Sequence, residues 1–284
     1  MPNIKEIKTR IESIRSTKQI TNAMKMVAAA NLRKAQDRII KARPYADIIN
    51  EMLRSIKHKN KTNFHPILAE ADPHGKAALI VVTSDRGLCG SFNTQIIKIA
   101  LNYLKKNPEV DVICLGRKGY DHLKKHSHKL MKPYLNLFNE MNFDVSKNVA
   151  EQIIDLFIEQ HYAKIDVIYN EFKSAIQQNI VEKQLLPIIP EESEEISKLD
   201  YLYEPDEDTI IEELGRKFIH VEIWRIMLES SAAEQGARMT AMDSATDNAT
   251  ELIDNLTLKY NRARQAAITT EIIEIASGAE AIQQ

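Results

Sequence analysis

Glycine and proline are almost absent from both ends of the chain. The sequence holds 8 glycines in 284 residues; none precedes Gly75, and five lie from Gly75 to Gly119. No proline follows Pro205. Because these residues interrupt helices more than any others, their placement predicts long helices at both ends and a domain with turns between them. An all-β sandwich or barrel, which needs turn residues about every 8–12 positions, is disfavoured.

The first long helix is expected over residues 3 to about 57. Stepping alternately by three and four from Ile4 follows an apolar heptad seam, which becomes polar from Lys18 to Lys25 and then continues with small apolar residues. Pro44 is the one interruption and predicts a kink or a short break. At 1.5 Å per residue the helix would be roughly 80 Å long, far more than a small domain can cover.

The second long helix is expected near the C-terminus. A similar seam runs from Ile211 to Thr270, and the acidic stretch 206–208 suits a helix N-terminus, where negative charge meets the dipole. Gly215 and Gly236 each weaken this helix by roughly 1 kcal/mol relative to alanine, without breaking it.

Between the helices the pattern changes to short apolar runs that alternate with helical stretches. This alternation predicts a small α/β domain with a mostly parallel sheet. The expected strands are 77–83, 110–115 and 165–169, the expected helices are 91–106, 117–126 and 148–161, and residues 181–189 are expected as an edge strand.

The N-terminal end of the chain is basic and the C-terminal end is acidic. Residues 1–62 carry 15 Lys or Arg against 5 Asp or Glu, whereas residues 206–284 carry 7 against 15. We therefore expect the two helices to pair as a long antiparallel coiled coil, with a Rossmann-like α/β domain, residues 75–190, at its side. An alternative is a coiled-coil adaptor or nucleic-acid-binding protein that uses the basic N-terminal helix. No aromatic residue precedes Tyr45 to stack on bases.

Catalytic and cofactor-binding signals are weak. The segment Ser84–Ser91 follows a strand, as phosphate loops do, but matches neither phosphate-binding glycine pattern, so nucleotide binding is a minor alternative. Cys89 lacks a neighbouring base and is expected to be a small buried residue. Three lysines would repel a cation from the histidines at 122, 126 and 128. We expect no metal, no cofactor, no catalytic residue and no membrane span.

Four blocks of sequence resemble the γ subunit of F-type ATP synthases. The most specific is Ile268–Ala281, which follows the pattern I/V-T-x-E with an acidic residue three later and then Gly-Ala. The others, in the family's order, are Ile11–Ala29, Ser84–Gly90 and Tyr260–Thr269.

This resemblance implies a function without catalysis by the chain itself. In the family the terminal helices form the rotor shaft inside an α3β3 hexamer of alternating α and β subunits. Proton-driven rotation changes the nucleotide sites in turn. The implied partners are that hexamer, the ε subunit and the membrane c-ring, with one copy of the chain per complex and no nucleic acid. The start of the sequence lacks the features of a leader peptide. We expect the cytoplasmic side of a bacterial plasma membrane; the alternative is the matrix side of the mitochondrial inner membrane.

The resemblance also implies positions that contact the hexamer. Arg264 and Gln265 match the block that meets an acidic loop of a β subunit, although Arg264 could also be an ordinary solvated charge. Arg86 and Lys98 match a second basic contact. Positions near the lower rim of the hexamer are Lys18, Met24, Lys25 and Arg238, although Met24 could also have a plain packing role. The tip that turns in an apolar sleeve is formed by Ile268, Ile272, Ile273 and Ile275.

Overall fold

The structure is a computed structural model. It describes residues 4–59, 67–68, 75–126, 129–131, 133–139, 141–175, 177–189 and 207–282. The chain divides into two compact units: the first joins Met1–Val27 to Met239–Gln284, and the second is Ala28–Arg238. Each unit is described by itself.

Two long helices contribute to both units. Helix α1 is Ile4–Lys59, with 56 residues, and α5 is Glu207–Ile282, with 76 residues. The expected long helices are confirmed, but the short break at Pro44 is not, because α1 continues through that residue. Proline in a helix interior costs about 3 kcal/mol. Burial of Ala46, Ile49 and Leu53 just beyond it offsets this cost, since their side chains are at least 92% buried in the core of the second unit.

In the first unit the helices α1 and α5 run antiparallel. The hydroxyl groups of Thr21 and Thr246 are 2.8 Å apart, and Lys25 forms an ion pair with Asp243, one turn earlier on α5. The polar part of the α1 seam therefore meets polar residues of α5. Beyond this pairing α5 continues with exposed side chains from Arg264 to Gly278.

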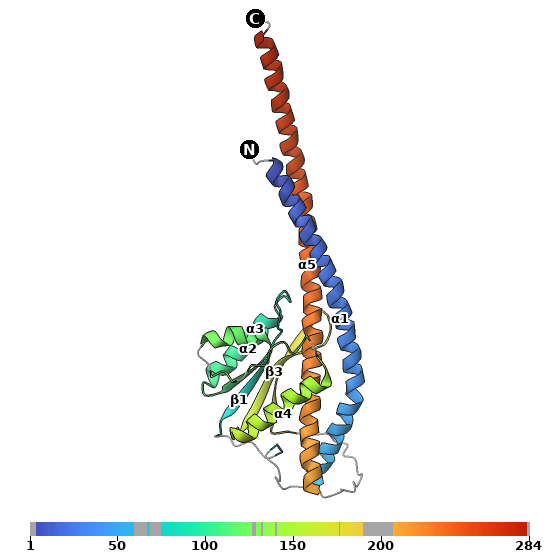
Figure 1. The fold of residues 1–284 in the computed structure, drawn as a ribbon, viewed down its shortest axis with the longest axis vertical. Helices are drawn as coiled ribbons and strands as arrows, with labels where there is room; N and C mark the ends of the chain where they lie inside the picture. Colours follow the sequence, from blue (N-terminus) through green and yellow to red (C-terminus); the bar gives the residue numbers. More distant parts are fainter. Residues whose placement is uncertain are drawn as a thin grey trace. The chain divides into compact units, whose positions relative to one another are not determined.

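The second unit is built on a four-stranded sheet (Figure 1). Its strand order is β2-β1-β3-β4, where β1 pairs in parallel with β2 and β3, and β4 pairs antiparallel with β3. The mostly parallel sheet with an added edge strand is thus confirmed, although the last strand begins and ends three residues earlier than expected. The strands are Ala77–Val82 (β1), Asp111–Leu115 (β2), Lys164–Phe172 (β3) and Gln178–Leu186 (β4).

Helices cover both faces of this sheet. On one face, α2 (Phe92–Lys106) packs on Leu79 and Val81 of β1. On the other face, α4 (Phe143–Glu159) packs with the parts of α1 and α5 that belong to this unit. Helix α3 (Arg117–Leu123) continues into a short 3-10 turn at Lys124–His126. Figure 1 shows α2 and α4 on opposite sides of the sheet.

Two glycines of α5 meet different surroundings in this unit. A Cβ atom on Gly236 would lie 3.2 Å from the Cα atom of Ala175, in the turn between β3 and β4. Among the described residues, a Cβ atom on Gly215 would meet side-chain atoms of Ile67 and Ile188, at 3.6 and 3.8 Å. Gly236 therefore permits close packing of helix and turn, whereas Gly215 has room for a methyl group.

Candidate partner-contact site

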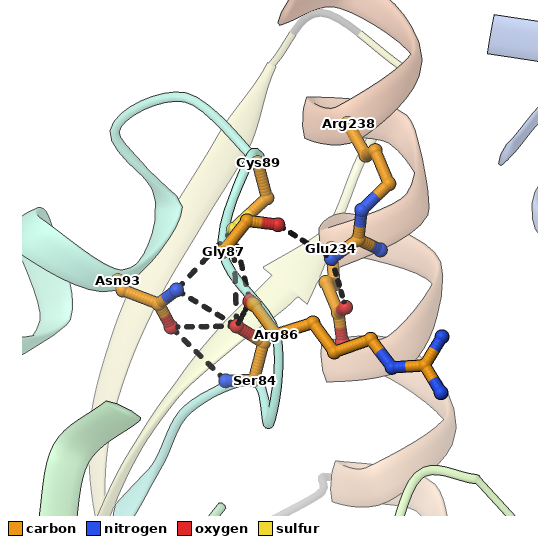
Figure 2. Close-up of polar contacts among 7 residues, drawn as sticks. All are labelled: Ser84, Arg86, Gly87, Cys89, Asn93, Glu234 and Arg238. Carbon is orange, nitrogen blue, oxygen red and sulfur yellow. Dashed lines mark hydrogen bonds and ion pairs between the residues drawn. The ribbon is translucent and has the colours of Figure 1, made fainter. Parts of the chain in front are cut away.

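The segment Ser84–Ser91 connects β1 to α2 and is shaped by hydrogen bonds of its own residues. The side chain of Asn93 lies at its centre: Oδ1 accepts from the backbone N–H of Ser84 at 3.0 Å, and Nδ2 donates to Ser84 Oγ at 2.7 Å. The same Nδ2 donates to Cys89 Sγ at 3.2 Å, and Ser84 Oγ donates to the carbonyl oxygen of Arg86 at 2.5 Å (Figure 2). These bonds fix the segment as a compact turn.

Cys89 faces the inside of this turn. Its side chain is 98% buried, and burial raises the pKa of the thiol. A thiol held in its neutral form is a poor nucleophile. The structure therefore supports the expectation of a small buried residue.

Helix α5 closes the turn from the other side. The guanidinium Nη2 of Arg238 donates to the carbonyl oxygen of Gly87 at 3.2 Å and lies 2.7 Å from Oε1 of Glu234 (Figure 2). Glu234 and Arg238 are 95% and 91% buried. Burial raises the pKa of Glu234, and the adjacent Arg238 opposes that rise. A buried carboxylate with such a partner stays paired, so the two residues join α5 to the turn.

Helix α5 packs close to the place where related folds bind ligands. Doubly wound sheets hold ligands at the carboxyl ends of strands where the chain order reverses, here between β1 and β3. Ala233 and Ala237 of α5 pack in the same core cluster as Val81 of β1 and Ile168 of β3. The turn directs a carbonyl oxygen, not an N–H group, toward Arg238. A phosphate would need N–H donors at this point.

Two of the expected contact residues project outward from this region. Arg86 is exposed on the turn, and Lys98 is exposed on α2. Figure 2 shows the Arg86 side chain extending away from Ser84 and Asn93. Arg238 is buried and donates to the carbonyl oxygen of Gly87, so its charge is used inside the second unit.

The other expected contact residues lie in the first unit. Lys18, Met24 and Lys25 are half-buried on α1, and Lys25 is paired with Asp243. Arg264 and Gln265 are exposed on α5. The four isoleucines of the expected tip are 47–65% exposed: Ile268, Ile272, Ile273 and Ile275. Three of them, Ile268, Ile272 and Ile275, share one helical face by their spacing of four and three.

Sequence reasoning missed several residues that shape this site. Glu234 was detectable, because it stands four positions before Arg238 and such pairs meet on a helix. Asn93 and Asp243 gave no comparable signal, because their partners lie on other elements. No group of three or more His, Cys, Asp and Glu side chains gathers as a metal site within the described ranges.

Comparison with known proteins identifies the family. A family model described as ATP synthase matches residues 3–282. The ATP synthase gamma chain of Prosthecochloris aestuarii is 49% identical over 290 residues, covering 100% of this chain and 99% of its own. The gamma chain of Chlorobaculum parvum is 47% identical over 292 residues, covering 100% of both chains.

Solved structures show the same fold. A chain of the central stalk and c-ring of Tetrahymena thermophila mitochondrial ATP synthase is 26% identical, with a TM-score of 0.61 over 80% of this chain and 99% of that one. A chain of Euglena gracilis mitochondrial ATP synthase, from a structure of OSCP, F1 and c-ring, is 19% identical, with a TM-score of 0.69 over 98% and 94%. Because the family model matches residues 3–282 and the gamma chain of Prosthecochloris aestuarii is 49% identical over the full length, the chain belongs to the gamma chain family of ATP synthases.

Proposed function

We propose that the chain is the central rotor shaft of the F1 sector of a proton-translocating ATP synthase. It couples proton-driven rotation to ATP synthesis at the catalytic β subunits. The observation that carries this proposal is full-length identity of 49% to a bacterial gamma chain. The two long helices, antiparallel and without a break in the described residues, give the stiffness that such a shaft needs.

The partners follow from the same relationship. The shaft stands in a hexamer of alternating α and β subunits, with one copy per complex, and its other end meets the ε subunit and the c-ring. The solved relatives come from central-stalk, F1 and c-ring assemblies, which supports this set of partners. Nucleic-acid binding by the basic N-terminal helix is not favoured by this family relationship.

Within the complex the chain acts without catalysing a reaction itself. Helix α5 packs through Ala233 and Ala237 on the same core as β1 and β3, and we assign catalysis to the hexamer. Rotation affects the nucleotide sites because the shaft presents different side chains to each β subunit. Only such differential contacts shift the populations of conformations.

The contact residues divide by role. Arg264 and Gln265 meet an acidic loop of a β subunit, and Arg86 with Lys98 forms the second contact. The lower rim of the hexamer meets Lys18, Met24 and Lys25, and the apolar sleeve holds Ile268, Ile272, Ile273 and Ile275. Arg238, expected at the rim, acts instead from inside the second unit, where it holds the turn that carries Arg86. The proposed domain division assigns residues 1–62 and 206–284 to the shaft and residues 75–190 to the globular domain. All exposed members of these sets are free to meet a partner.

The complex is peripheral to the cytoplasmic face of a bacterial plasma membrane. This placement is supported by the bacterial origin of the relatives. None of the helices in the described part of the chain has the length and apolarity needed to cross a bilayer.

Copurification tests the proposal. An affinity tag on the chain, expressed in its native cell, should recover α and β subunits with one copy of the chain per hexamer, as measured by native mass spectrometry. Hexamers that assemble and hydrolyse ATP in full without this chain would overturn it.

A further inference from the structure

Leu88 combines two unfavourable features at the tip of the turn after β1. Its backbone φ is +63°, in the left-handed region, and its side chain is 65% exposed. Left-handed backbone costs a non-glycine residue roughly 1–2 kcal/mol, and glycine or asparagine is the usual residue there. An exposed leucine also forgoes the stabilisation of burial. Neither feature stabilises the free chain.

The rest of the turn is held firmly, so that this backbone conformation is imposed on Leu88. The carbonyl oxygens of the two preceding residues accept hydrogen bonds, Arg86 from Ser84 and Gly87 from Arg238. The next residue, Cys89, is buried against Asn93 (Figure 2). Because the residues before and after Leu88 are held toward the interior, the Leu88 side chain points outward. Strain that the surroundings enforce in this way gathers at functional sites.

Two exposed cations lie close to the turn that carries Leu88. Arg86 is exposed on the turn itself, and a Cβ atom on Gly87 would lie 3.8 Å from Cε of the exposed Lys118. The nearby carboxylate of Asp85 is buried and accepts N–H donors from the backbone. Glu234 is buried with Arg238. A surface that is apolar at its centre and basic at its border suits an acidic partner with an apolar pocket.

We propose that Leu88 is an apolar anchor, by which this turn docks into a pocket bordered by carboxylates on the hexamer. The inference rests on the proposed function, and it adds an uncharged residue to the contact formed by Arg86. Interfaces draw most of their binding energy from a few such buried anchors, surrounded by polar contacts that exclude water. The strain at Leu88 keeps its side chain presented before binding.

Two substitutions separate the anchor from the strain. Leu88→Asn suits left-handed backbone but removes the apolar side chain. We expect it to raise the midpoint of thermal unfolding of the free chain by roughly 2–4 °C and to weaken binding to a purified hexamer about tenfold or more. Leu88→Met keeps the apolar volume and the strain. It should leave the melting temperature unchanged and retain affinity to within about threefold.

A matched control replaces a leucine-sized residue elsewhere on the same unit. Ile189 is also 65% exposed, and Ile189→Asn should not change affinity for the hexamer. Binding is measured by titrating labelled hexamer, assembled without the chain, with each full-length variant. Equal affinity of Leu88→Asn and wild type, or a fall in its melting temperature, would overturn the inference. If the wild-type chain itself does not bind, the proposed function fails together with the inference.

Discussion

The guanidinium of Arg238 donates a hydrogen bond to the carbonyl oxygen of Gly87 at 3.2 Å, although 151 positions separate the two residues. The bond joins α5 to the turn that carries Arg86 and Leu88. Glu234, one helical turn before Arg238, holds the guanidinium in place at 2.7 Å. Within the second unit, α5 therefore supports the outward-facing turn.

Removing Arg238 should destabilise the second unit strongly. Arg238→Met leaves the carboxylate of Glu234 buried without its cation, and breaking a buried pair in this way costs about 3–5 kcal/mol. Urea denaturation of the free chain, followed by circular dichroism, measures this loss. The double variant Arg238→Met with Glu234→Leu removes both charges and should recover much of it. A double variant as unstable as the sum of the two single variants would contradict this account.

The two glycines of α5 should respond in opposite directions to a methyl group. Gly215→Ala adds helix propensity, and the described atoms near its methyl group are side-chain atoms at ordinary contact distance, so it should stabilise the chain by up to about 1 kcal/mol. Gly236→Ala brings a Cβ atom within 3.2 Å of the Ala175 backbone, so it should be neutral or destabilising. Thermal unfolding of both variants tests the pair. Equal stabilisation by both would show that the turn at Ala175 yields freely.

Stability should depend on the ionisation of Glu229. Burial raises the pKa of this carboxyl above its usual 4.5, and the Glu171 carboxylate raises it further. Its Oε2 atom is buried and has no hydrogen-bond partner within the described structure. The cations that oppose the rise come from α5, β4 and α1: Arg225, Lys183 and Arg43.

The sign of this pH effect follows from the raised pKa. The folded chain holds the proton more tightly than the unfolded chain, so the contribution of Glu229 is fully present below pH 4.5 and is lost as the pH rises through the folded pKa. Glu229→Gln cannot ionise. Its stability relative to wild type should therefore increase between about pH 5 and pH 8, as measured by urea denaturation at each pH. A constant difference across this range would show that Glu229 has an ordinary pKa.

Charge reversal at Arg264 should slow the complex without affecting the fold. The side chain is exposed, so Arg264→Glu should leave the unfolding of the free chain unchanged. A glutamate facing an acidic loop should lower ATP turnover of the reconstituted complex by at least about threefold. Arg262→Glu, at a neighbouring exposed position, is the control and should have a smaller effect. Equal turnover for Arg264→Glu and wild type would remove this residue from the contact.

The parts of the fold that follow local periodicity were predictable from the sequence. The expected helix over 91–106 is Phe92–Lys106, and the expected strand over 110–115 is Asp111–Leu115. Glycine and proline placement predicted α1 and α5 because these two residues act on the backbone locally. The start of α4 was expected five residues too late. The sequence does contain a signal for this start, because asparagine is a preferred N-cap residue. In the structure Asn142 Oδ1 accepts the N–H of Val145 at 2.8 Å.

Other features depend on contacts between distant segments. Pro44 lies within a continuous helix because tertiary packing outweighs the local penalty. The pairing of Lys25 with Asp243 joins α1 to α5, and the burial of Arg238 against Gly87 joins α5 to the turn after β1, so both need the folded chain. The left-handed backbone of Leu88 has no sequence signal, because leucine is a poor residue for that conformation.

The most direct test of the rotor proposal is observation of rotation in single complexes. The hexamer is fixed to a surface, and a probe is attached to the chain through Lys105→Cys, at an exposed position of α2; the native Cys89 and Cys114 are buried. On addition of ATP, the probe should turn continuously in one direction and should stop when ATP is removed. A probe that stays fixed, or that fluctuates without direction while the hexamer hydrolyses ATP, would contradict the account.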